Sequence, residues 1–183
     1  MRAVTRLFGL AAASMLVAGV AQAQKHEFGV DVGLVSTKAD GIDDRMLTFG
    51  TPVDVRIGFV GAGKLTWEGR FGLNYTKFGD ASSMSFTPGV NVLYKLGAAT
   101  NTQGLYVTGG GSWSMNKEDD GTNDATISQL GVNVGIGHRK PIGSASLRTE
   151  VFFASHFENG DPGPEFAPAL TQFGVRFGIS LWH

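Results

Sequence analysis

The sequence predicts an all-β protein in which eight antiparallel strands close into one up-and-down transmembrane β-barrel. Eight segments of about 9–14 residues alternate between apolar residues and polar residues or glycine, the pattern of a strand with one apolar face. The connections between them are long and short in turn, as in barrels that cross a membrane. The chain of 183 residues is long enough for one domain and contains 27 glycines and no cysteine.

The N-terminal segment has the parts of a secretory signal peptide. Arg2 and Arg6 begin it, an apolar run follows, and Ala21-Gln22-Ala23 forms a small-x-small cleavage site. The apolar run has about 14 residues, fewer than the roughly 20 that a membrane-spanning helix needs. We therefore expect a signal peptide at residues 1–23 and an outer-membrane β-barrel domain at residues 24–183.

Composition excludes several classes of protein. After cleavage, 13 Lys and Arg would face 16 Asp and Glu, a formal charge of −3 that gives no basic footprint for nucleic acid. No apolar run of the mature chain approaches 18 residues, which excludes a helical membrane protein. Without cysteine, an exported chain must be stabilised by closure of its sheet and by packing.

The first four strands are expected at residues 26–36, 52–60, 65–78 and 86–96. In the first, Phe28 and Val30 alternate with Glu27 and Gly29, and the other three repeat this pattern. Pro52 opens the second strand, where a missing N–H group is tolerated. The expected connections are polar segments at 37–50 and 79–85 and a tight turn at 61–64.

The last four strands are expected at residues 105–115, 127–138, 144–157 and 171–183, joined by connections at 97–103, 116–126, 139–143 and 158–168. In the final strand, Phe173, Val175 and Phe177 alternate with Gly174 and Arg176. It is long enough to cross a bilayer as a tilted strand, which takes roughly 9–11 residues. Its backbone groups could not stay unpaired in hydrocarbon, so the strands must close into a barrel.

The two kinds of connection predict an orientation. Those after the first, third, fifth and seventh strands are mostly long and acidic, whereas those after the second, fourth and sixth are short. Long outer loops and short periplasmic turns are typical of outer-membrane barrels, and an even number of strands places both termini on the periplasmic side.

The polar face carries charges of both signs, which favours a narrow lumen filled by ion pairs over a solvated outer surface. An eight-stranded barrel is just wide enough for its own side chains, and charges buried there must be paired. We therefore expect a packed polar plug, with a narrow path for small solutes as the alternative. The predicted lumen charge network is Asp31, Asp54, Arg56, Glu68, Arg70, Lys95, Arg148, Glu150 and Arg176.

Large aromatic residues of the apolar face cluster near strand ends, like the two aromatic girdles of a membrane barrel. A soluble, lipocalin-like periplasmic barrel would instead turn its apolar face inward around a ligand. The predicted girdle residues are Trp67 and Tyr94 at the periplasmic boundary and Tyr75, Phe86, Trp113, Phe157 and Phe173 at the outer one.

The signal peptide, the eight alternating strands and the terminal Arg176-Phe177-Gly178-Ile179-Ser180-Leu181-Trp182-His183 together resemble one family. It is the outer membrane protein beta-barrel family of the OmpA transmembrane domain and OmpX type. Arg176, Gly178 and Leu181 fit its terminal assembly signal, whereas His183 stands where the family usually has Phe. The resemblance implies an outer-membrane location, contact with outer-membrane lipid and lipopolysaccharide, and the barrel-assembly machinery as a partner during biogenesis.

No catalytic, metal or cofactor site is predicted. His156 lies near the outer loops in a stretch that faintly resembles lipid A deacylase barrels, but Glu158 replaces the serine nucleophile. Ser155 adjoins His156 and would point to the opposite face of its strand. The acidic loop 117–124 lacks the spacing of a calcium-binding loop. We expect a monomeric, non-enzymatic protein with a structural, adhesive or surface-ligand-binding role through its acidic loops, and with no nucleic-acid partner.

Overall fold

The computed structural model describes residues 25–49, 53–61, 63–78, 81–119, 124–159 and 166–182. The predicted signal peptide, Pro52 and His183 lie outside these ranges. Among the described residues, no helix is long and apolar enough to cross a membrane. The strands are β1 (Lys25–Ala39), β2 (Met46–Phe49), β3 (Val53–Val60), β4 (Leu65–Phe78), β5 (Ala81–Lys95), β6 (Gly104–Asp119), β7 (Asp124–Ile142), β8 (Ala145–His156) and β9 (Leu170–Trp182).

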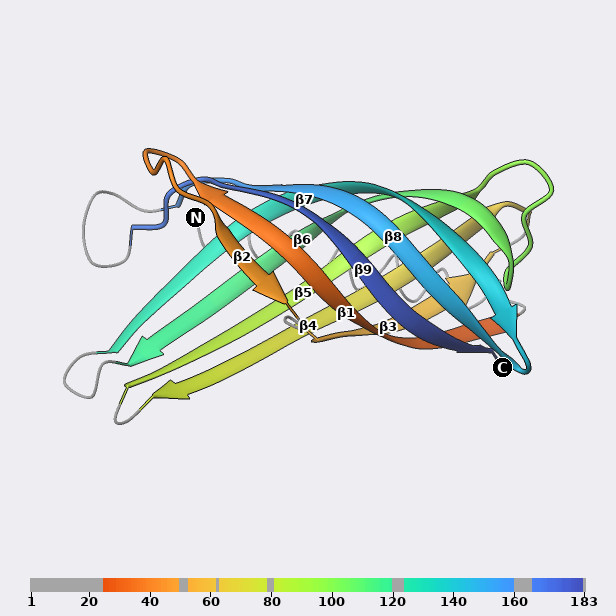
Figure 1. Cartoon of the computed structure of the whole chain (residues 1–183), viewed down its shortest axis with the longest axis horizontal. Helices are drawn as coiled ribbons and strands as arrows, with labels where there is room; N and C mark the ends of the chain where they lie inside the picture. Colours follow the sequence, from red (N-terminus) through yellow and green to blue (C-terminus); the bar gives the residue numbers. More distant parts are fainter. Residues whose placement is uncertain are drawn as a thin grey trace, which may run out of the picture.

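The strands form one closed antiparallel barrel. Each strand from β3 to β8 pairs with the next along the chain, and β9 pairs with β1 along its whole length. β2 and β3 both pair with β1, along the edge that does not face β9. Because they follow one another along this edge, they count as one strand position, and the nine strands make an eight-stranded barrel. The predicted eight-stranded up-and-down antiparallel barrel is confirmed (Figure 1).

The register of the strand pairs determines the shear number of the barrel and hence the tilt of its strands. Residue partners lead from His26 on β1 through Phe59, Trp67, Val92, Gly109, Val134, Phe153 and Phe173 back to Ser36 on β1. The path returns ten residues beyond its start (36 minus 26), which is the shear number of the barrel. With about 3.3 Å per residue and about 4.8 Å between strands, the strands tilt by about 40° from the axis.

The strands are longer at one end than the sequence predicts. β5 begins at Ala81, β6 continues to Asp119 and β7 starts at Asp124, so much of the predicted loops 79–85 and 116–126 is strand. Polar residues there pair across hairpins, where alternation no longer marks a buried face. The β4–β5 and β6–β7 hairpins therefore project from the left end of the barrel in Figure 1.

Two other predicted boundaries are also wrong. The polar segment 37–50 contains β2, which pairs with β1 but has no partner on its other side within the described part of the chain. β7 continues to Ile142 and so includes the predicted turn at 139–143 as far as that residue. Pro141 does not end the strand, because it pairs with Ser146 next to the turn, and only one further residue pair follows. A proline is tolerated at such a strand end.

The apolar face points outward and the polar face inward. On β1, Phe28, Val30, Val32 and Leu34 are 38–49% exposed, whereas Glu27 and Asp31 are 1% exposed. The same alternation continues on the other strands. This arrangement suits a barrel surrounded by lipid and excludes the alternative of a soluble barrel with an apolar interior.

Glycines on the inward face make room for large lumenal side chains. The guanidinium group of Arg56 lies over Gly29, the imidazole of His156 over Gly131, and the Tyr106 phenol over Gly137. A Cβ atom at any of these glycines would collide with the side chain across from it. The glycine-rich inner face is therefore a packing requirement of a narrow barrel.

We expect Gly137→Ala to destabilise the barrel by about 1–3 kcal/mol, because the added methyl group would displace the Tyr106 ring. Urea unfolding in lipid vesicles, followed by the difference in gel migration between folded and unfolded forms, measures this loss. Gly69→Ala is the matched control, since a Cβ atom there would have only ordinary contacts of 3.7 Å or more. Equal unfolding midpoints for the two variants would contradict the packing role.

Candidate functional site in the lumen

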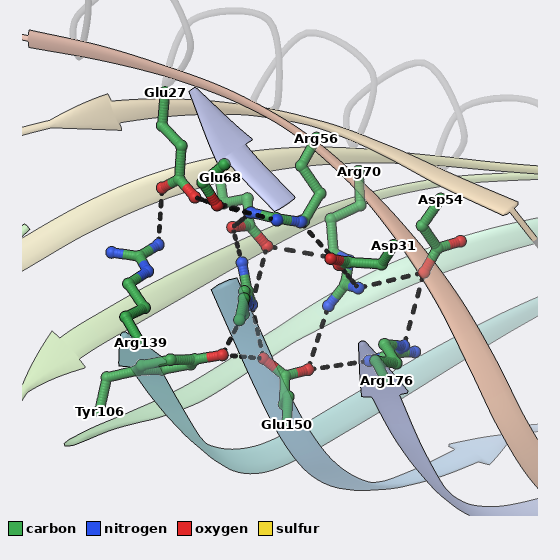
Figure 2. Close-up of polar contacts among 12 residues, drawn as sticks. Glu27, Asp31, Asp54, Arg56, Glu68, Arg70, Tyr106, Arg139, Glu150 and Arg176 are labelled. Carbon is green, nitrogen blue, oxygen red and sulfur yellow. Dashed lines mark hydrogen bonds and ion pairs between the residues drawn. The ribbon is translucent and has the colours of Figure 1, made fainter. Parts of the chain in front are cut away.

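We call the end of the barrel that holds Lys25 and Trp182 periplasmic and the opposite end extracellular, as the sequence predicts. The lumen contains a network of ion pairs that joins five carboxylates to five guanidinium groups among the described residues (Figure 2). The carboxylates are those of Glu27, Asp31, Asp54, Glu68 and Glu150, and the guanidinium groups are those of Arg56, Arg70, Arg139, Arg148 and Arg176.

Arg56 connects β3 to β1 and β4. Its Nη1 atom lies 2.8 Å from Glu27 Oε1 and 3.3 Å from Glu68 Oε2, and its Nε atom lies 2.6 Å from Asp31 Oδ2. Ser180 donates to Glu27 Oε1 at 2.6 Å, which brings β9 into the same cluster. The guanidinium group of Arg56 and its partners thus link β1, β3, β4 and β9, including the pair β1 and β9 that closes the barrel.

Arg148 and Glu150 stand two residues apart on β8, so both point into the lumen. Arg148 donates to Glu68 Oε2 and to Glu150 Oε2, each at 2.5 Å, and its Nε donates to the Tyr106 hydroxyl. Tyr106 in turn donates to Glu150 Oε2 at 3.0 Å. These contacts cross the lumen from β8 to β4 and β6.

Arg70 and Arg176 complete the network toward the extracellular end. Arg70 contacts Asp31 at 3.2 Å, Asp54 at 3.1 Å and Glu150 at 3.2 Å. Arg176 lies 3.0 Å from Glu150 Oε1 and 3.4 Å from Asp54 Oδ2, and its guanidinium carbon lies 3.5 Å from the centre of the Phe152 ring. Glu150 therefore meets three arginines and one tyrosine.

Arg139 extends the network toward the periplasmic end. Its guanidinium carbon lies 5.2 Å from the centre of the Tyr106 ring and 5.0 Å from that of Trp182, and its Nη2 donates to Glu27 Oε2 at 2.6 Å. Trp182 donates to the Ser146 hydroxyl at 3.0 Å. Arg139 thus contacts two aromatic rings and one carboxylate at this end of the lumen.

Eight of the nine charges that the sequence predicts for the lumen lie in this network. The ninth, Lys95, donates to Asn101 at 2.6 Å near the periplasmic end. Sequence reasoning missed Glu27, Tyr106 and Arg139 as members. Arg139 was missed because it was assigned to a turn, although it has the inward parity of Gly135 and Gly137.

The wall made by β5, β6 and β7 differs from the rest of the lumen. It contributes Tyr106 and Arg139 to the network and, among the described residues, no carboxylate. Its inward positions are mostly glycine and neutral polar residues, including Asn91, Thr108 and Asn133. This wall carries Lys95 and Arg139 toward its periplasmic end, but its middle is uncharged. We call this middle part, which holds Asn91, Thr108 and Asn133, the neutral side of the lumen.

The structure places His156 inside the extracellular half of the lumen. Its side chain is 8% exposed and lies over Gly131, while Ser155 has the opposite parity on β8. A serine hydroxyl on the other face of a strand cannot pass its proton to this imidazole. Among the described residues, no group of three or more His, Cys, Asp or Glu side chains could hold a metal ion.

The predicted girdle residues all have the outward parity, though to different degrees. Tyr75, Phe157 and Phe173 are 53–61% exposed near the extracellular end, whereas Tyr94 is 44% exposed near the periplasmic end. The remaining three vary: Trp113 is 40% exposed, and Trp67 and Phe86 are half-buried. Their role at the two boundaries of the membrane stays a prediction.

The C-terminal residues of the predicted assembly signal take part in the barrel itself. Gly178 makes room for Asp31, whose carboxylate lies where a Cβ atom would stand. Leu181 is 50% exposed on the outer face, and Arg176 points into the lumen. Their recognition by the assembly machinery stays a prediction.

Comparison with known proteins gives structural relatives but no sequence relatives. No protein-family model and no curated protein matches the sequence. Neisserial surface protein A is similar in structure with a TM-score of 0.60 and 12% identity, over 85% of this chain and 96% of that one. Ail, the attachment invasion locus protein of Yersinia pestis, has a TM-score of 0.51 and 10% identity, over 87% and 99% of the two chains.

A closed eight-stranded barrel with an apolar exterior and a charged lumen defines a class, the small β-barrels of the outer membrane. Both structural relatives belong to it. Because identity is low, the likeness shows the fold alone, and at that level it confirms the resemblance to barrels of the OmpA and OmpX type. The predicted outer-membrane location agrees with this fold.

Proposed function

We propose that this protein is a non-enzymatic outer-membrane barrel that binds a cationic surface partner through its acidic extracellular end. The network of five carboxylates and five arginines supports this proposal most directly, because acids and arginines are equal in number within it and each of them is paired. We infer that side chains paired in this way fill the lumen, so that it offers neither an ion path nor a free acid–base pair. Binding is then a task for the loops.

The charges of the connections are divided between the two ends. The four predicted outer segments, 37–50, 79–85, 116–126 and 158–168, contain eleven acidic and three basic residues. The three short connections at 61–64, 97–103 and 139–143 contain three basic residues and no acidic one. A negative field at the extracellular end attracts cations and steers cationic partners.

One of the structural relatives provides a contrast. A second structure of Ail, with a TM-score of 0.50 and 8% identity to this chain, is a complex with the heparin analogue sucrose octasulfate. That ligand carries many negative charges, which the acidic loops of this chain would repel. We propose the opposite preference here: basic peptides or proteins.

Binding of poly-lysine and of sucrose octasulfate to the barrel in lipid nanodiscs tests this proposal. We expect poly-lysine to bind, with an affinity that falls as salt rises, and sucrose octasulfate not to bind. Replacing the exposed Asp40, Asp43 and Asp44 by Asn should weaken poly-lysine binding, and Arg45→Gln in the same loop should strengthen it. Preferential binding of the sulfated sugar would contradict the proposal.

Conductance across planar bilayers tests the filled lumen separately. We expect no discrete channel events from the wild-type barrel, because side chains of the network occupy the lumen. Regular unitary currents would favour the alternative of a narrow channel for small solutes.

A further inference from the structure

We propose that the neutral side of the lumen holds a specific site for one bridging water molecule, built by Asn91 of β5, Thr108 of β6 and Asn133 of β7. This site is distinct from the surface binding proposed above. It lies beside the ion-pair network rather than within it.

Gly110 brings the two asparagines together. Its position on β6 is paired with Asn91 on one side and with Asn133 on the other. Because glycine has no side chain, the two amide groups meet in front of it, and Asn133 Nδ2 donates to Asn91 Oδ1 at 3.2 Å. Thr108 stands two residues before Gly110 on the same face, so it is a diagonal neighbour of both asparagines.

Three polar atoms of this cluster are buried and have no hydrogen-bond partner in the described part of the chain. They are Asn91 Nδ2, Thr108 Oγ1 and Asn133 Oδ1. Asn91 is 1% exposed and Thr108 is 6% exposed, so bulk solvent does not satisfy them. Buried polar groups nearly always have a partner, and ordered water supplies it where protein does not.

The three atoms match the bonding capacity of water. A water molecule can accept from Asn91 Nδ2, donate to Asn133 Oδ1 and share its third bond with the Thr108 hydroxyl. Three bonds are the usual number for a buried water. A metal cation suits the site less well, because the Asn91 amide group presents its donor side and the cluster contains no carboxylate.

Gly135 limits where the methyl group of Thr108 can lie. A Cβ atom at Gly135 would lie 3.1 Å from Thr108 Cγ2 and 3.4 Å from Glu150 Cγ. The methyl group of Thr108 therefore lies beside Gly135, its partner on β7. Its hydroxyl is the branch without a protein partner, and we infer that it bonds to the bridging water.

Thr108→Val tests the site, because it replaces the hydroxyl by a methyl group of nearly the same size. If the water is bound, the variant should lower the urea midpoint and weaken the NMR cross-relaxation between water and the side-chain amide protons of Asn91. If the hydroxyl has no partner, removing it should raise the midpoint, which would overturn the proposal.

Thr149→Val is the matched control, since Thr149 has the outward parity on β8 and should leave the water signal at Asn91 unchanged. A high-resolution crystal structure of the wild-type barrel gives a second measurement that needs no variant. Density for a water within hydrogen-bond distance of the three atoms would support the site. A reciprocal pair in which Asn91 Nδ2 donates directly to Asn133 Oδ1, with no water density, would overturn it.

Discussion

Glu150→Gln should cost the barrel about 3–5 kcal/mol of unfolding free energy, the usual loss when one partner of a buried ion pair is removed. Glu150 is 1% exposed and contacts Arg70, Arg148 and Arg176. The glutamine amide has the same shape but no charge, and its NH₂ group would face donors. The network would be left with five arginines and four carboxylates in a medium of low dielectric constant.

Urea unfolding in lipid vesicles measures this loss of unfolding free energy. Two further variants test whether charge imbalance causes it. Glu158→Gln changes an exposed glutamate beyond the end of β8 and should leave stability within about 0.5 kcal/mol of wild type. Glu150→Gln combined with Arg176→Gln restores the balance of charge and should cost less than the sum of the single changes. Losses that simply add would refute charge imbalance as the cause.

The sequence predicts the barrel well because the same rule applies to every strand. Outward residues must be apolar in lipid and inward residues must fit a narrow polar lumen, so alternation marks each strand that crosses the membrane. The rule weakens where the strands leave the membrane. This explains why β2 and the projecting ends of β5, β6 and β7 are missing from the prediction.

The candidate site is predictable only in part for a related reason. Parity shows which charges point inward, so eight members of the network are found from the sequence. Which charges meet depends on the shear of the barrel, and alternation carries no information about shear. For example, Glu27 and Arg139 lie on strands that are not neighbours and meet only across the lumen. In the same way, the sequence does not show which side chain lies over each inward glycine, because that depends on the register.

An arginine in the middle of the apolar exterior should be almost as damaging as the loss of Glu150. Val134 is 59% exposed on β7, with Val132 and Ile136 beside it on the same face. Arginine near the midplane of a bilayer costs about 2–4 kcal/mol on the lipid face of a barrel. We therefore expect Val134→Arg to lower the unfolding free energy in phospholipid vesicles by that amount.

Ile142→Arg provides the control that relates this loss to membrane depth. Ile142 ends β7 at the periplasmic turn, has the same parity as Val134 and is similarly exposed at 53%. Arginine there can extend into the headgroup region, so the cost should fall to about 0–1 kcal/mol. A loss of this size at Val134 and not at the similarly exposed Ile142 is what a surrounding bilayer predicts. Equal and small losses at both sites would show that water, not hydrocarbon, covers the apolar face.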